Sequence, residues 1–462
     1  MKGLVLVNRK QKRKGVTFLM KDEKKSKRSD REKKHEGLSR RDFMKKAGVT
    51  AAAVGMSSTV PGFLKPARAA AVRDHILIGR PLPMTGPVSA FTAASPWLDN
   101  KAIADMNKDG GIFIKEAGKK LPVRVKIVDT ESDPTKAGDA GSKLILNDNV
   151  DIMYVSCTPA TVSPVAAVCE RYKVPCVSTM MPVEMFLPGG PFQWSFDASF
   201  SVGDYVASFL QMWENVKTNK TVGLLAQNDA DGVAWADASN RDLKGAGYKV
   251  IDLGRFPAGT MDYGTIIAGW KKENVEIMFA NMSPPDFARV WRQAFRENFI
   301  PKIATIGRAA MFPAAVEALG GDLGLGVSSE APWHPSYPFK SSLTGETAKQ
   351  VGDAYEAQSG KQWIVPLGGT YSGYEIVADV LNRAQTLDKE TLRKAFAATN
   401  LNTLQGPTKF NEKNVAITPS GGLQWVKGKK FPFDCMLVAN GNYKMLPTDA
   451  KMASIHDLRG MK

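Results

Sequence analysis

The chain has 462 residues, of which 43% are hydrophobic, so it is long enough for two or three domains with large cores. Its formal net charge of +16 is the one feature that would indicate nucleic-acid binding. Residues 1–69, however, hold 20 Lys and Arg against 6 Asp and Glu, whereas the remaining chain holds 42 against 40. Because the basic surplus is confined to a segment that we expect to be removed, no nucleic-acid partner is predicted.

That first segment has the parts of an export signal. Residues 39–45 read S-R-R-D-F-M-K and resemble the twin-arginine consensus S-R-R-x-F-L-K. The weakly apolar run 47–64 is too polar for a stable membrane span, and residues 67–69 form an A-x-A cleavage site. No Cys lies next to this cleavage site, so no lipid anchor is expected. We predict export by the twin-arginine translocase, cleavage near Ala69 and a periplasmic protein; residues 1–38 are either a true extension or a misplaced start.

Predicted strands and helices alternate regularly after the signal. Strands are expected at 76–79, 121–128, 151–155 and 176–178, and helices at 97–107, 137–146 and from 163 onwards. Ser163 is the expected N-cap of that last helix, with Pro164 in its first turn. This alternation predicts a parallel sheet that is covered on both faces.

The pattern restarts after residue 196 and predicts a second parallel lobe. Strands are expected at 221–226, 248–253, 275–280 and 302–306, with helices at 204–214, 235–244, 265–272 and 287–297. A connector rich in Pro and aromatic residues follows at 331–338. Three further helices at about 344–358, 369–384 and 389–399 lead to a hairpin-like end at 422–425 and 435–439.

Two hydroxyl-rich loops end neighbouring strands of the first lobe, at 156–161 and 178–180. In parallel sheets, ligands bind outside the carboxyl ends of the strands. Hydroxyls and free amides at a helix start suit a small anionic ligand. The alternative is that these loops are ordinary turns capped by Ser and Thr.

Short motifs in a fixed order resemble the branched-chain amino-acid type of periplasmic binding protein over residues 72–445. They are Ile76-x-Ile78-Gly79, Thr85-Gly86, Asn107 with Gly110-Gly111-Ile112, Val128-Asp129 with Asp133-Pro134, and the stretches 286–294 and 371–381. The resemblance implies an α/β fold of two Rossmann-like lobes with parallel sheets, joined by three hinge crossovers, that close over a ligand. The expected lobes are 72–195 with 330–425, and 196–329 with 426–462.

The resemblance also implies which residues bind the ligand. In the first lobe, the residues that would receive a ligand carboxylate are Ser156, Thr158, Thr161, Ser178, Thr179 and Met180. In the second lobe, the positions that would face a ligand ammonium fall near Asp229, Asp231 and Asn281. Arg308 lies where the family has a further acid, and within the cleft it would attract a carboxylate instead. Trp333 and Tyr337 of the connector would stack on a flat ligand.

Each of these residues also has a possible structural role. Asp229 and Asp231 can cap the following helix. Met180 can fill the core, and Arg308 can form a surface salt bridge. The aromatic residues of the connector can pack the hinge.

We therefore predict a non-enzymatic solute-binding subunit of an ABC importer, without cofactor or metal, that delivers its ligand to permease subunits in the inner membrane. Its ligand is expected to be a small carboxylate: an amino acid, or an aromatic or other organic acid. A ligand-sensing module for a membrane receptor is the alternative. An exported cofactor enzyme is disfavoured, because the sequence after residue 69 has three histidines and lacks C-x-x-C, H-E-x-x-H and G-x-S-x-G motifs. The four cysteines show no metal-binding spacing, and we expect mostly buried thiols.

Overall fold

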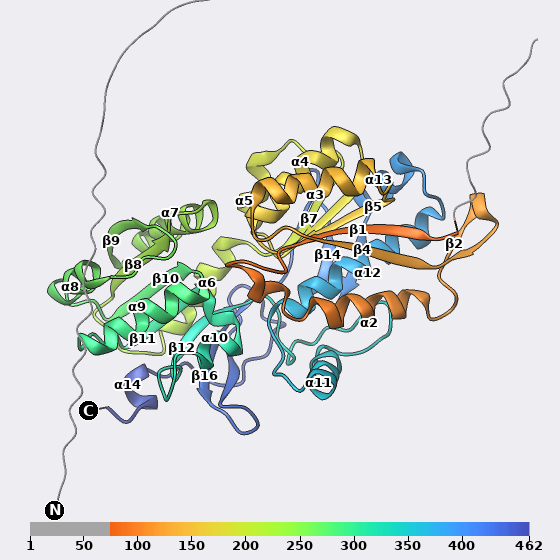
Figure 1. The fold of residues 1–462 in the computed structure, drawn as a ribbon. Helices are drawn as coiled ribbons and strands as arrows, with labels where there is room; N and C mark the ends of the chain where they lie inside the picture. The colour runs from red at the N-terminus through yellow and green to blue at the C-terminus, as the bar shows by residue number, and fades with distance from the viewer. Residues whose placement is uncertain (1–73, 462) are drawn as a thin grey trace, which may run out of the picture. The chain divides into compact units, whose positions relative to one another are not determined.

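The computed structural model describes residues 74–461, which form two lobes, each built around one large sheet (Figure 1). The twin-arginine motif and the A-x-A site lie outside the described residues. Among residues 74–461, no helix is both long and apolar enough to cross a membrane.

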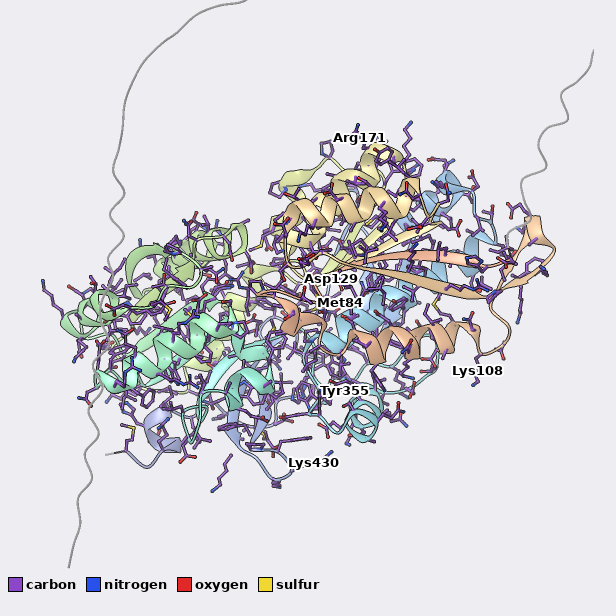
Figure 2. All side chains as sticks on the ribbon, in the orientation of Figure 1. Met84, Lys108, Asp129, Arg171, Tyr355 and Lys430 are labelled. Carbon is purple, nitrogen blue, oxygen red and sulfur yellow. The ribbon has the colours of Figure 1, made fainter. Side chains whose placement is uncertain are left out.

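The first sheet has six strands in the order β15-β7-β6-β5-β1-β4, and every neighbouring pair is parallel. Its strands are β1 (Ile76–Leu82), β4 (Val123–Asp129), β5 (Ile152–Ser156), β6 (Cys176–Thr179), β7 (Ser195–Ser199) and β15 (Val415–Ile417). Met84 and Asp129 lie together at the ends of β1 and β4 (Figure 2), where Asp129 Oδ1 accepts from the Met84 N–H at 3.0 Å. The loops that follow parallel strands thus gather at one edge of the sheet.

Helices cover both faces of this sheet, as Figure 1 shows: α2 (Ser95–Asn107) and α12 (Pro366–Ala384) on one face, α3 (Pro134–Leu146) and α4 (Pro159–Tyr172) on the other. Strand β5 shows why. Alternate side chains point to opposite faces of a strand, so Tyr154 packs into the cluster with α2 and α12. Val155 packs into the cluster with α3 and α4. A strand buried on both faces must be apolar throughout, which is the pattern that the sequence showed.

The second sheet has seven strands in the order β17-β16-β12-β11-β10-β8-β9. The five strands from β12 to β9 are parallel, while β16 and β17 form the expected antiparallel hairpin. The strands are β8 (Thr221–Gln227), β9 (Lys249–Phe256), β10 (Ile277–Met282), β11 (Ile303–Arg308), β12 (Val327–Ala331), β16 (Gly421–Lys427) and β17 (Phe433–Ala439). Helix α6 (Val202–Trp213) precedes β8. The strands β8 to β11 are followed in turn by α7 (Ala230–Gly245), α8 (Gly264–Lys272), α9 (Pro284–Arg296) and α10 (Pro313–Glu317).

The chain crosses between the lobes three times: after β7, after β12, and between β15 and β16. This confirms the predicted α/β fold of two lobes with mainly parallel sheets. The sequence placed the last crossover after residue 425, but Leu423 of β16 already pairs with Ser329 of β12 in the second sheet. The smaller elements are β2 (Ile112–Ile114), β3 (Lys119–Leu121), α5 (Val183–Phe186), α11 (Ala348–Ser359), α13 (Lys389–Ala397), β13 (Asn400–Thr403), β14 (Gly406–Lys409) and α14 (Ile455–Leu458).

Helix α4 begins earlier than the sequence predicted. Its first residue is Pro159 and its N-cap is Thr158, so the expected start at Ser163 is wrong. Like Pro164, Pro159 is suited to the first turn of a helix, and α4 begins at Pro159, the earlier of the two prolines. Pro164 lies inside the helix, where its missing N–H would have met the carbonyl of Ala160 in the first turn. The earlier start brings the first turn of the helix directly to the end of β5.

Glu375 on α12 provides a test of the buried packing. Its Oε2 accepts from the Leu404 N–H at 2.7 Å, and its Oε1 accepts from the Ser342 hydroxyl at 2.9 Å. Burial raises the pKa of Glu375 to about 7, although these hydrogen bonds oppose the shift. Since an unfolded Glu titrates near pH 4.3, the folded chain holds an extra proton between about pH 4.3 and 7. Its contribution to stability is full below that window and falls as the pH rises through it, by about 4 kcal/mol in total.

We therefore expect Glu375→Gln to reduce the slope of the free energy of unfolding against pH by up to about 1.4 kcal/mol per pH unit, with the largest effect between about pH 5 and 6. Denaturant unfolding at several pH values measures this slope independently of any constant loss of stability. Glu412→Gln changes an exposed residue and should retain the wild-type slope. An unchanged slope in Glu375→Gln would show that this carboxyl does not take up the proton.

Candidate ligand-binding site between the lobes

A cavity lies between the two lobes, at the ends of their parallel strands. Its lining comes from both sides: Phe91, Thr158, Pro159, Met180 and Pro182, and then Phe200, Tyr205, Asp231, Trp235, Asn281, Arg308, Met311 and Glu330. Its volume is about 30 Å³, roughly the share of one water molecule in the liquid. Pockets that hold small molecules measure roughly 300–1,000 Å³, so the lobes must separate before a solute can enter.

Thr158 forms the polar part of the first-lobe wall. It is the N-cap of α4, yet its side chain makes no capping bond, and its Oγ1 is buried without a partner among residues 74–461. Cys157, Thr158 and Met180 all have φ between +61° and +70°, a region that non-glycine residues rarely adopt outside functional loops. A free hydroxyl at the positive end of a helix can receive an anionic group.

Four other predicted residues of the first lobe do not line this cavity. Ser178 Oγ donates to Asp197 Oδ1 at 2.7 Å, and Thr179 Oγ1 lies 3.2 Å from the Tyr154 hydroxyl, so both are used within the sheet. Ser156 Oγ accepts from Cys157 Sγ at 3.6 Å. Thr161 Oγ1 is buried without a partner in the described chain, one turn further along α4. Of the six residues predicted in this lobe, Thr158 and Met180 reach the cavity.

Arg308 ends β11 and is neutralised by protein carboxylates. Its Nη1 lies 2.9 Å from Asp231 Oδ2 and 3.1 Å from Asp229 Oδ2. The two aspartates keep the pKa of Arg308 above its usual value although burial opposes this. Arg308 lines the cavity, but its charge is paired with Asp229 and Asp231 rather than left for a ligand carboxylate. The strand order β8-β10-β11 brings the loop after β8 to the end of β11, where the two aspartates take that place.

The sequence left open whether Asp229 and Asp231 cap a helix or face the ligand, and the structure gives one of these roles to each. Asp229 caps α7, because its Oδ1 accepts from the Gly232 N–H at 2.7 Å, and its side chain remains 35% exposed. Asp231 in the first turn lines the cavity and is buried. Burial raises the pKa of Asp231, and Arg308 opposes the shift.

Glu330 is a site residue that the sequence analysis missed. It ends β12 and lines the cavity, where its Oε1 accepts from the Arg308 N–H at 2.9 Å and its Oε2 accepts from Ser329 Oγ at 2.8 Å. Burial raises its pKa as well. An acid at the end of a buried strand was the signal that could have revealed it. The second lobe thus places three carboxyl groups, those of Glu330, Asp229 and Asp231, beside the single guanidinium of Arg308. This wall is therefore acidic and suits a cationic or hydrogen-bond-donating group.

Aromatic rings and unpartnered polar atoms complete the cavity. The rings belong to Phe91, Phe200, Tyr205 and Trp235, none of which follows a recognisable motif. Within the described residues, the Tyr205 hydroxyl and Asn281 Oδ1 are buried without hydrogen-bond partners, like Thr158 Oγ1. Arg308 Nε is a fourth such atom. Buried polar groups are nearly always paired, so four orphaned atoms around one cavity mark a place for a ligand.

The connector residues lie elsewhere. Trp333 is fully buried and meets Trp363 edge-on, with ring centroids 5.8 Å apart. Tyr337 donates its hydroxyl to the Ala331 carbonyl. Neither side chain lines the cavity, so the structure uses both to pack the segment after β12.

The described chain offers no sign of a metal centre. Among residues 74–461, no group of three or more His, Cys, Asp or Glu side chains could hold a metal ion. The four cysteines are buried free thiols, as the sequence predicted. The site therefore presents hydroxyls, carboxylates, an amide, the guanidinium of Arg308 and aromatic rings.

Comparison with known proteins identifies the family. The model of the family described as periplasmic binding protein matches residues 75–430. The chain is 22% identical to the Leu/Ile/Val/Thr-binding protein of Salmonella typhimurium over 343 residues, which cover 74% of this chain and 89% of that protein. It is 23% identical to the leucine-specific-binding protein of the same organism, over 74% of this chain and 88% of the relative.

Solved structures show the same fold. A leucine-binding protein from Thermotoga maritima superposes with a TM-score of 0.67 at 21% identity, over 79% of this chain and 99% of that one. A solute-binding protein of an ABC transporter from Rhodopseudomonas palustris, in complex with 3,4-dihydroxybenzoic acid, gives 0.64 at 18% identity, over 82% and 99%. The family match spans most of the chain, and the chain therefore belongs to the periplasmic binding protein family.

Proposed function

We propose that this protein is the solute-binding subunit of an ABC importer, and that its ligand is an amino acid with an apolar or aromatic side chain. The observation that carries the proposal is the opposite character of the two cavity walls. The first lobe offers the Thr158 hydroxyl at a helix start for a carboxylate, and the second offers Asp231 and Glu330 for an ammonium. The two Nη atoms of Arg308 are already paired with Asp229 and Asp231, and only its Nε is left without a partner in the described chain, so Arg308 is a poor receptor for a second carboxylate.

The relatives support this choice, since several are named as binding proteins for leucine, isoleucine and valine. An aromatic acid without an ammonium is the second candidate. It is favoured by the aromatic lining and by burial, which raises the pKa of Asp231 and Glu330 and so favours neutral carboxyls that can donate hydrogen bonds. A structural relative carries such an acid.

Function then follows from lobe motion rather than chemistry. A cavity of about 30 Å³ holds no amino acid, so the ligand enters an open form and the hinge segments return the lobes to contact. In our proposal the closed form is presented to permease subunits of the inner membrane. A sensor that reports to a membrane receptor would use the same closure, and the identity of the partner distinguishes the two.

Matched ligand pairs test the ligand class. Calorimetry should compare L-phenylalanine with 3-phenylpropanoate, and L-leucine with 4-methylpentanoate, because each pair differs by the ammonium group. We expect each amino acid to bind at least tenfold more tightly than its partner. Thermal unfolding gives a second readout, since a ligand at about 100 times its Kd adds about 2.7 kcal/mol. Tighter binding of the acids would favour the second candidate.

Thr158→Val should weaken binding of the preferred ligand by roughly 1–3 kcal/mol, because a carboxylate would lose its buried donor. Thr161→Val is the matched control: Thr161 is also buried and unpartnered within the described chain, but it does not line the cavity. The control should bind normally in calorimetry. Equal affinities of both variants and the wild type would remove the first-lobe wall from the site.

We also propose that the protein reaches the periplasm through the twin-arginine translocase and is cleaved near Ala69. The family supports a periplasmic location, and the S-R-R-D-F-M-K motif supports the route. Replacing Arg40 and Arg41 together by Lys should leave unprocessed precursor in the cell, and normal periplasmic accumulation would count against this route.

A further inference from the structure

A second cavity, with a volume of about 430 Å³, lies beside the first. Its walls come from both lobes: Ala93 follows η1 (Ser89–Thr92), Phe312 precedes α10, Gln362 and Ile364 lie between α11 and α12, and Phe431 lies in the turn between β16 and β17. The volume falls within the range of pockets that hold small molecules.

This second cavity is separate from the proposed solute site. Phe91 lines the solute cavity, whereas its neighbour Ala90 lines the second one. The Phe91 ring meets the Phe312 ring edge-on, with centroids 4.9 Å apart, and this pair forms the partition. Among the described residues, none lines both cavities.

Contacts between the lobes hold the walls in place. Lys430, next to Phe431, forms an ion pair with Glu356 on α11, with Nζ and Oε2 2.6 Å apart. Figure 2 labels Lys430 and also Tyr355, the neighbour of Glu356 that lines the cavity. The cavity is therefore bounded by segments that approach each other in this arrangement of the lobes.

Gln362 determines which polar group a ligand of this cavity must carry. Its side chain is 7% exposed, and its Nε2 donates to the Phe433 carbonyl at 3.1 Å. This bond fixes the orientation of the amide and leaves Oε1 as a buried acceptor without a partner in residues 74–461. An acceptor in this position needs a donor. The charged lining residues, Lys361 and Glu317, are exposed and opposite in sign, so the site does not favour a charged occupant.

We propose that this cavity is a second ligand site, for a small neutral molecule with an apolar body and one O–H or N–H donor for Gln362 Oε1. Alcohols and phenols belong to this class. Since its walls come from both lobes, the occupant stabilises the lobe arrangement in which the solute cavity is closed.

The test uses 4-(trifluoromethyl)benzyl alcohol as the probe and follows its fluorine resonance as purified protein is added. We expect a saturable shift for the wild type and at least tenfold weaker binding of the methyl ether of the probe, which has no donor. Ala93→Phe fills the cavity from an exposed position and should abolish the shift. Ala246→Phe, at the exposed end of α7, is the matched control and should bind the probe normally.

The proposal would be overturned by the absence of a saturable shift with the wild type, by equal affinity for alcohol and ether, or by normal binding in Ala93→Phe. Thermal unfolding of Ala93→Phe and Ala246→Phe checks that both variants are folded. The comparison of alcohol and ether uses the wild-type protein and needs no variant. Thr158→Val should leave probe binding unchanged, and a loss of binding in that variant would place the probe in the solute cavity instead.

Discussion

Replacing Arg308 by Met is expected to lower the free energy of unfolding by about 3 kcal/mol at pH 7. The guanidinium is buried and holds Asp229 and Asp231 together at distances of 2.9–3.1 Å. Without it, two like charges remain side by side, and Asp231 is buried. Breaking a buried pair costs roughly 3–5 kcal/mol, and the lower end applies because Asp229 is partly exposed.

The pH dependence distinguishes this charge effect from a simple loss of packing. Burial already raises the pKa of Asp231, and removing Arg308 raises it further. The variant therefore binds a proton on folding over a wider pH range, and its deficit should be smaller at acidic pH than at pH 7. Denaturant unfolding at pH 7 and pH 4 measures both values.

Arg241→Met is the matched control, because Arg241 pairs with Asp242 at 2.8 Å on an exposed surface. It should unfold like the wild type, since exposed pairs contribute little. If Arg308→Met also unfolded like the wild type, the aspartates would not depend on Arg308. Its charge would then be available to a ligand anion, and the aromatic-acid alternative would gain support.

The lobes could be predicted because local patterns determine them. The largely apolar stretch 275–280, bounded by polar turns and followed by a helical pattern, predicted a buried parallel strand without knowledge of its neighbours, and β10 occupies Ile277–Met282. The start of α4 could not be decided in the same way. Thr158-Pro159 and Ser163-Pro164 carry similar start signals, and only the packing of the helix against β5 distinguishes them.

The site depended on contacts between distant parts of the chain. Arg308 and Asp229 are 79 residues apart in the sequence, and the order of the strands decides that they meet. Glu330 and the four aromatic residues of the cavity carry no motif. The resemblance to the family indicated the correct edge of each sheet. It could not indicate which side chains form hydrogen bonds or ion pairs with other protein groups and are therefore not available to a ligand.

Gly368→Ala is the other change with a large expected effect, because α12 packs directly on the connector that follows β12. A Cβ at Gly368 would lie 2.0 Å from Cδ1 of Trp333, far inside van der Waals contact. Trp333 is fully buried and also meets Trp363, so it has no space to move away. Overpacking of this kind costs about 3 kcal/mol.

We expect Gly368→Ala to lower the Tm by several degrees. Gly245→Ala, at the end of α7, is the control: nothing lies within 4 Å of its added Cβ, so Ala should be neutral or stabilise the chain by about 0.5 kcal/mol. Trp333→Phe tests the cause. If the indole is the obstacle, the double variant should be more stable than Gly368→Ala alone, since the smaller ring makes room for the methyl group. A Gly368→Ala protein as stable as the wild type would mean that the connector yields to α12, and the packing role of Trp333 would then have to be abandoned.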